Sequence, residues 1–440
     1  MTKRTRQTRH GALPRLAAIG AAVCTVLAPA AAPAVDLTAV FHGGVGYSDN
    51  IGRDPTGTLD EMYSRVGLDL DAFQDSARLN LDLRSNLSYQ WYEEAFDSEF
   101  VGGVDAFAEV TLIEDRLTWV VEENYGQVLT DPLLPSRPDN REDTNFFSTG
   151  PQLSLDVATR TILNIGARYG AVNFETRPLD NDRREGTVSL AREIREDTFL
   201  SLNAQREEVE FSDDLVAAND FDRNEYFLRY RGDRARNSFS FDIGYTELEL
   251  QDGTSDGVLA RLSMERRLSP VSTISISGGT RFSDQGNIFR FLQDIARTPG
   301  QTGDLGEVAT PFRNDYANFV YLAEGQRTSF DLRLGWSGED YEDRADLNRE
   351  FLIGDMMFER DLTRRIFTTV NVRYIRRDFS DVDRRDEDLL LSLLFGYRLN
   401  PSLNVTLQGG RFDRDSDQAL SSFTENFAFL ALNYIPGWGR

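Results

Sequence analysis

The sequence has 440 residues, with 72 acidic against 48 basic side chains and a formal net charge of −24. That balance argues against nucleic acid as a partner, because binding to phosphate needs a basic surface. No lysine follows Lys3, and Cys24 is the only cysteine, so neither a disulfide nor a thiolate metal site is expected.

The first 34 residues have the pattern of a secretory signal peptide. Lys3 and four arginines precede an apolar run at 16–28, and small residues follow at 29–34. The run is shorter than a membrane-spanning helix and its far flank is rich in small residues, which favours cleavage near Ala32 or Ala34 over a retained anchor. We expect residues 1–34 to be removed.

The next feature is a strict alternation of apolar and polar side chains. In the stretch ARLNLDLRSNLSYQW at 77–91, leucines and aromatics fall on one parity and polar residues on the other. Successive strand residues point to opposite faces, so this stretch predicts a long strand with one apolar and one polar face. The same pattern recurs at 163–170, 239–246, 330–337 and 370–374. At 313–324 and 421–434 large apolar groups occur on both parities, which leaves the facing of those strands open.

The connections between these runs alternate in length. Tight turns follow the even-numbered strands, for example at 74–75, 114–115 and 196–197. Longer segments rich in Asp, Asn, Gly and Pro follow the odd-numbered strands, for example at 48–62, 129–143 and 283–313. Short turns at one end and long loops at the other are typical of outer-membrane barrels, with both termini on the periplasmic side.

We therefore predict an all-β fold for residues 35–440: a single transmembrane, antiparallel, up-and-down β-barrel of about 20 strands (range 16–20). A sheet in a bilayer must close, because lipid cannot satisfy free backbone groups. A secreted β-sandwich, a propeller or a solenoid would also alternate. The long strands, the charged inner parity and the loop asymmetry favour the barrel, in the bacterial outer membrane.

The two parities predict two sets of functional residues. The apolar parity meets lipid, and its aromatic residues near strand ends are candidates for interfacial girdles: Tyr89, Trp91, Trp119, Tyr125, Trp336 and Tyr341. The polar parity lines the lumen and carries candidate arginines for contact with substrate: Arg65, Arg84, Arg168, Arg229, Arg261, Arg281, Arg333 and Arg373. Rings of such groups favour anions in a pore, although arginine–aspartate pairs between strands also brace barrel walls.

Catalysis is not expected from this sequence. His10 and His42 are the only histidines, and a Ser-His-Asp arrangement would have to use His42, on the predicted polar parity of the first strand. No zinc-protease, nucleophile-elbow or phosphate-loop motif occurs. Acidic clusters such as 378–383 and 413–417 read as solvated loop charge rather than Ca²⁺ sites. We expect neither a metal nor a cofactor.

The opening strand and loop FHGGVGYSDN at 41–50, with the overlapping stretch GYSDNI at Gly46–Ile51, begin an acidic, arginine-rich series of strands. In these features the chain resembles the outer-membrane "putative beta-barrel porin 2" type proteins, which are often associated with exopolysaccharide gene clusters, and more distantly the alginate-export porins. One departure is the C-terminus, where a terminal aromatic is usual and this chain runs from Asn433 to Arg440, with Tyr434 or Trp438 as substitutes. The resemblance implies a role in passing a polysaccharide or assisting its export.

Two functions of different class follow from the sequence. The first is a channel for a hydrophilic saccharide, anionic if the arginines line the pore. The second is a non-conducting structural or binding barrel that anchors envelope components. The segment 283–313 exceeds the usual length of a loop without function, and it would plug or cap the lumen. The expected partners are outer-membrane lipid and lipopolysaccharide, a polysaccharide and the barrel-assembly machinery.

Overall fold

The protein is described here from a computed structural model. The structure describes residues 35–56, 59–214, 216–251, 253–295, 309–341, 347–380 and 384–437. The predicted signal peptide, 1–34, lies outside these ranges, as does the part of the 283–313 segment between 296 and 308.

Long antiparallel strands make up nearly all of the described chain. Their bounds are β1 (Asp36–Ser48), β2 (Glu61–Asp75), β3 (Leu79–Tyr92), β4 (Glu99–Ile113), β5 (Leu117–Leu129), β6 (Arg141–Ala158), β7 (Thr161–Phe174), β8 (Asn181–Arg195), β9 (Thr198–Phe211), β10 (Phe221–Arg234), β11 (Asn237–Leu250), β12 (Gly253–Ser269), β13 (Ser272–Ser283), β14 (Phe312–Glu324), β15 (Thr328–Asp340), β16 (Arg349–Asp361), β17 (Ile366–Phe379), β18 (Arg384–Asn400), β19 (Leu403–Ser416) and β20 (Phe423–Tyr434). In the described ranges, one α-helix, α2 (Gln285–Ile295), and three short 3-10 helices, η1 (Pro138–Asn140), η2 (Ala217–Asn219) and η4 (Ala419–Ser421), lie in the longer connections.

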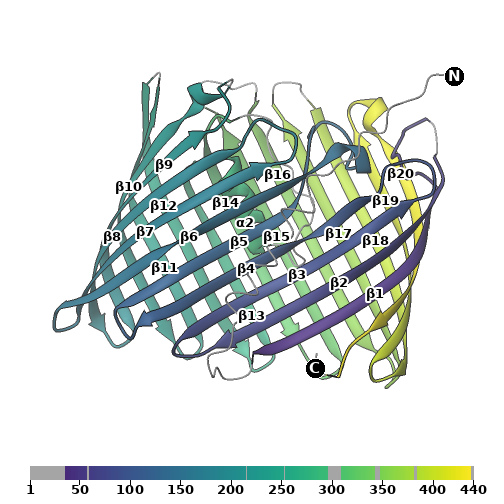
Figure 1. Ribbon diagram of the computed structural model, residues 1–440, viewed down its shortest axis with the longest axis horizontal. Coiled ribbons are helices and arrows are strands. Elements are labelled where there is room, and N and C mark those ends of the chain that lie inside the picture. Colours follow the sequence, from purple (N-terminus) through teal and green to yellow (C-terminus); the bar gives the residue numbers. More distant parts are fainter. Residues whose placement is uncertain are drawn as a thin grey trace. The chain divides into compact units, whose positions relative to one another are not determined.

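The 20 strands form one closed sheet (Figure 1). Each strand pairs with the strands before and after it in the sequence, and β20 pairs with β1, where Gly46 lies opposite Phe429. Closure leaves no free edge in the described sheet, which is the condition for a sheet to cross a bilayer. The predicted fold class, an up-and-down antiparallel barrel, is confirmed.

The two faces of the wall follow the alternation of the sequence. Large apolar side chains on the outer parity are exposed, including Leu202 and Val258. Polar side chains on the other parity, such as Asn124, Asp242 and Asp388, are buried. An apolar outer face and a polar inner face are those of a barrel in the outer membrane.

Two segments whose facing the sequence left open are now placed. In β14, Trp336 of the next strand lies opposite Ala317 on the outer face, so Asn314, Tyr316 and Asn318 point inward. In β20, Leu430, Leu432 and Tyr434 are exposed on the outer face. The opposite parity of β20, with Phe427 and Phe429, therefore faces the lumen.

Candidate functional site

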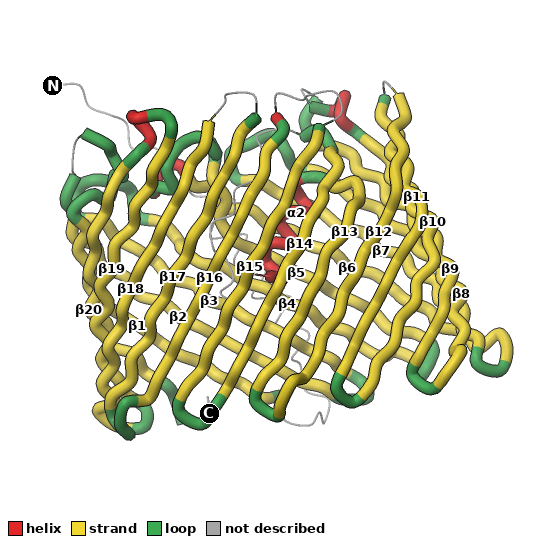
Figure 2. Tube along the Cα trace, turned by 180° about the vertical axis from the view of Figure 1, so that it is seen from behind, coloured by secondary structure: helices red, strands yellow, loops and turns green. Residues whose placement is uncertain are grey.

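The connection between β13 and β14 enters the barrel. Ser283, the last residue of β13, pairs with Phe312, the first of β14, and α2 is seen inside the wall in both views (Figures 1 and 2). The helix begins after Asp284, whose Oδ1 accepts hydrogen bonds from the backbone amides of Gly286 (2.9 Å) and Asn287 (3.2 Å). Asp284 is thus the N-cap of α2.

Asp284 also fixes the start of α2 to β8 of the barrel wall. Both terminal nitrogens of Arg183 on β8 bond to its carboxylate, Nη1 at 3.1 Å, and Arg183 Nη1 also bonds to Glu207 of β9 at 3.2 Å. All three side chains are buried. Burial alone raises the pKa of Asp284, but the charges of Arg183 and Arg223 outweigh it and hold that pKa at about 2. A two-pronged arginine–carboxylate pair fixes both position and direction.

A second ion pair and an apolar cluster hold the body of the helix. Arg290 bonds through Nε to Glu122 of β5. Ile288 and Phe289 are buried, Phe289 completely, against apolar residues from the inner wall and the loop ends. That cluster, called the helix seat below, consists of Val128, Phe146, Val172, Phe174, Leu179, Ile288, Phe289, Ala309, Phe312 and Tyr341. The helix seat covers the inner face of β5, β6 and β7.

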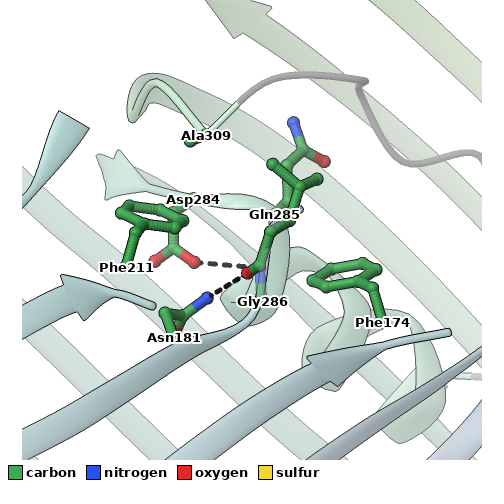
Figure 3. A pocket seen from close by; sticks show the side chains of 8 residues that line it. Phe174, Asn181, Phe211, Asp284, Gln285, Gly286 and Ala309 are labelled. Carbon is green, nitrogen blue, oxygen red and sulfur yellow. Dashed lines mark hydrogen bonds between the residues drawn. The ribbon is translucent and has the colours of Figure 1, made fainter. Parts of the chain in front are cut away.

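A small pocket lies at the N-terminus of α2 (Figure 3). Its lining includes apolar residues, among them Phe174, Phe211 and Ala309, and the polar residues Asn181, Asp284 and Gln285. The polar groups are already engaged: the side-chain amide of Asn181 donates to the carbonyl of Leu179 at 2.9 Å. The pocket therefore belongs to the packing of the helix seat and does not form a separate ligand site.

From Arg183 the ion pairs continue around the inner wall. The next link joins Glu207 to Arg223 of β10. The others, with their nitrogen–oxygen distances, are Arg223–Glu225 (3.8 Å), Arg261–Glu225 (3.2 Å), Arg261–Asp242 (3.0 Å) and Arg229–Asp242 (2.7 Å). This ion-pair ladder spans β8 to β12 and neutralises two of the predicted lumen arginines, Arg229 and Arg261.

The structure places the eight predicted arginines on the inner parity but gives them different surroundings. Three more face carboxylates, in the pairs Arg84–Asp105, Arg168–Glu122 and Arg333–Asp331. Arg373 lies opposite Asp355 in the register of β16 and β17. Arg281 stacks on Tyr316 at 5.7 Å. Arg65 bonds through Nε and Nη2 to the side-chain oxygen of Gln90. Their role in substrate contact stays a prediction.

The predicted aromatic girdle divides into two groups. Trp91, Trp119 and Trp336 are exposed, as is expected of side chains that meet lipid, and Tyr89 packs edge-on against Trp91. Tyr125 and Tyr341 differ from the prediction, because 7% and 1% of their surface is exposed. Tyr341 belongs to the helix seat, where its hydroxyl accepts from Gln285 Nε2 at 2.8 Å. Its position near a strand end did not reveal that it points inward.

His42 lies between a serine and an aspartate on the inner wall. Its Nε2 is 3.1 Å from Ser88 Oγ, and its Nδ1 is 3.6 Å from Asp69 Oδ2. Gly67, opposite Ser88 in the sheet, leaves room for this contact, since a β-carbon there would lie 2.3 Å from His42 Nε2. Hydrolysis also needs free amides to stabilise an oxyanion. Ser88 sits mid-strand between β2 and β4, where the ladder uses its backbone groups. His42, Ser88 and Asp69 therefore form a polar contact on the lumenal face.

In the described part of the chain, no group of three or more histidine, cysteine, aspartate or glutamate side chains is arranged to hold a metal ion. Among the same residues, no helix is long and apolar enough to cross a membrane.

Comparisons with known proteins give one family and several distant structures. Residues 354–434, from within β16 to the end of β20, match the family model described as "Putative beta-barrel porin 2". No curated protein matches the chain. Among solved structures, OccK2 (OpdF) from Pseudomonas aeruginosa in complex with glucuronate is 12% identical, with 91% of this chain and 98% of that chain covered and a TM-score of 0.36. The siderophore receptor PirA from Acinetobacter baumannii is 7% identical (91% and 81% covered, TM-score 0.44). The FrpB iron transporter from Neisseria meningitidis is 9% identical (91% and 81% covered, TM-score 0.45).

The closed wall and its apolar outer face indicate the class of protein. A closed sheet with an apolar outer face is stable only in a membrane, and strands of this kind span the bacterial outer membrane. The chain is therefore an outer-membrane β-barrel whose residues 354–434 are similar to the "Putative beta-barrel porin 2" family.

Proposed function

We propose that this barrel passes a hydrophilic saccharide across the outer membrane, that the saccharide is anionic, and that the barrel serves exopolysaccharide export. The observation that carries the channel proposal is the exposure of inward-facing residues on β2. Asp69 has 44% of its side chain exposed and Phe73 has 54% of its surface exposed, although both lie on the lumenal parity. Water therefore reaches the inner wall on that side, and a wall wetted from inside is the basis of a pore.

The helix seat supports a second part of the proposal. α2 occupies lumen space in front of β5, β6 and β7, and its anchors, Asp284 and Arg290, bind wall residues on β8 and β5. We propose that the segment narrows the channel and leaves the β2 side as the path for solute. The same contacts favour the alternative function, a structural barrel closed by its own loop, if the remaining path is too narrow to conduct.

Conductance of the refolded chain in a planar bilayer tests these two functions. The wild type is compared with a variant in which a short Gly-Ser linker replaces residues 285–310, which is feasible because Ser283 and Phe312 are already paired neighbours. A matched control shortens the loop 93–98 between β3 and β4. We expect a steady current in the wild type and a larger one only in the linker variant.

Each other outcome has a definite meaning. Current only in the linker variant would show a plugged barrel. No current in either, from protein verified as folded, would overturn the channel and leave the structural barrel. A current that selects cations or that no saccharide reduces would reject the anionic-saccharide part alone.

A further inference from the structure

Three aromatic side chains face the lumen on strands that border the β1–β20 junction. Tyr63 lies on β2, and Phe427 and Phe429 lie on β20; all three are half-buried. Tyr63 shares the inner parity with Arg65, and the outer parity of β20 carries the exposed Leu430 and Leu432. Most of the inner wall is polar, so large apolar rings on this parity need an explanation. They are called the aromatic strip below.

Glycines let the rings of the strip lie close against the wall. A β-carbon on Gly46 would be 2.2 Å from Tyr63, one on Gly44 would be 2.8 Å from Phe429, and one on Gly410 would be 2.4 Å from Phe427. The Tyr63 and Phe429 rings are nearly parallel, at 7°, with centroids 5.8 Å apart. The two nearly parallel rings lie against glycines two residues apart on β1 and form a flat aromatic surface, called the platform below.

A cation stands beside this platform. The Arg65 guanidinium carbon is 5.3 Å from the Phe429 centroid and 5.8 Å from that of Tyr63. Its Nε and Nη2 donate to Gln90 at 2.9 and 2.5 Å, while Nη1 has no hydrogen bond and the guanidinium no ion pair in the described part of the chain. Arg84 and Arg229, by contrast, are each neutralised by a carboxylate. Arg65 therefore keeps donors for an anionic group.

We propose that the aromatic strip and Arg65 form a binding site for an acidic pyranose unit of a glycan chain. The apolar C–H face of a sugar ring packs on an aromatic face, whose π-electrons carry partial negative charge. The free donors of Arg65 bind the sugar carboxylate, a pairing that suits the planar guanidinium. This inference deepens the proposed function and rests on it, since it names the class of saccharide and the wall that meets it.

A purely structural role is the competing explanation. An aromatic ring over a glycine on the neighbouring strand also stabilises a sheet. Phe367 provides a matched control inside the same protein: it lies against Gly396, with a β-carbon there 2.0 Å away, and under Arg398 at 4.6 Å. Arg398, however, is paired with Asp361 at 2.7 Å. Phe367 thus has the packing of the strip without its free cation.

The test measures block of single-channel current by hexagalacturonate and by maltohexaose, which differ in charge. We expect the acidic oligomer to block the wild type more strongly. The Tyr63→Leu/Phe429→Leu variant should weaken block by both sugars about tenfold or more at unchanged open current. Arg65→Gln should remove most of the preference for the acidic sugar and leave maltohexaose block in place. Phe367→Leu should change neither.

Several results would overturn the site. They are equal block in the double variant and the wild type, an equal loss in Phe367→Leu, and an unchanged acid preference in Arg65→Gln. A barrel that conducts but is blocked by neither sugar would reject the site and keep the channel. If the barrel conducts in no form, the channel fails, and calorimetric titration of hexagalacturonate into the detergent-solubilised barrel decides on the site. If the double variant does not fold, Phe427→Leu and Tyr63→Leu are measured singly.

Discussion

The helix seat and the aromatic strip are two sectors of one inner wall. Similar residue types serve different purposes in them. In the helix seat, Phe146 is buried under Arg290 of the inserted segment, which also bonds to Glu122. In the strip, Phe429 stays half-buried beside Arg65, whose charge meets an amide and two rings. In the first sector these side chains are engaged in internal contacts. In the second the rings are half-buried, and Arg65 has no ion pair among the described residues.

The difference teaches that composition of the inner parity does not decide function. The arginines of the ion-pair ladder are paired with carboxylates and the helix seat is apolar, so these strands support α2. Buried charges that already have partners offer little to a passing solute. Selectivity is expected in the sector where Arg65 lies beside the rings and has no ion pair among the described residues, and the experiments below separate the two sectors.

The largest effect is expected from Arg183→Ala. The change leaves Asp284 and Glu207 buried without their cation, and losing one partner of a buried pair costs about 4 kcal/mol. α2 should leave its seat while the barrel stays closed. Because Cys24, the only natural cysteine, lies in the segment expected to be removed, Ala309→Cys supplies the single thiol. Its rate of maleimide labelling reports release, since Ala309 is buried in the seat.

The neighbouring residue supplies the control. Arg184→Ala removes an exposed side chain that pairs with Glu208 and Glu210 on the outer parity. Exposed pairs contribute at most about 1 kcal/mol, so labelling at position 309 should stay slow. Equal labelling in both variants would mean that Arg183 does not hold the helix.

A smaller release is expected from Phe289→Ala. Phe289 is completely buried in the helix seat, and truncating a buried phenylalanine costs about 3 kcal/mol. The same labelling assay should show faster reaction than in the wild type and slower reaction than in Arg183→Ala. Block by saccharide, which the strip controls, should keep its acid preference. A change of that preference would show that the two sectors are coupled.

Acid should release α2 by the same route. The pKa of Asp284 is held at about 2, below the value of about 3.9 for a free aspartate. A carboxyl with a lowered pKa in the docked state stabilises docking above the undocked pKa, and that contribution is lost as the pH falls from about 4 through about 2. Open-channel current should rise in this window. Asp284→Asn keeps the capping group but not the charge, so its current should not change there.

The sequence was sufficient for the fold because alternation and turn chemistry are local. The long strand at 77–91 appears as β3, and the tight turns at 114–116 and 196–197 place Asp115 and Asp197 at positive φ, where short polar residues are tolerated. The sequence did not decide which parity of the strand at 421–434 faces the lumen, because aromatic rings occur on both parities. The inward rings Phe427 and Phe429 are the cause, and they belong to the strip.

The candidate site could be predicted only in part, because its contacts join distant strands. Alternation placed Arg65 on the inner face, but nothing local distinguished it from Arg84, whose partner Asp105 lies on another strand. α2 was predicted as loop, since its apolar residues find their partners on β5 to β7. Tyr341 was assigned to the lipid face for the same reason. A signal was available at Gly44 and Gly46, where two missing side chains on one face can mark room for rings.

The smallest effect is expected from removing a wall pair without changing the net charge. Arg84→Ala together with Asp105→Ala deletes both members of one inner ion pair, so the lumen keeps its charge and the reversal potential should stay within error of the wild type. Arg65→Gln removes a charge that has no ion pair among the described residues and should shift the reversal potential toward cation preference. The two variants are measured in the same salt gradient, at low ionic strength, where screening is weakest. A shift in the double variant as large as that in Arg65→Gln would mean that paired arginines also set selectivity, and the distinction between the two sectors would fail.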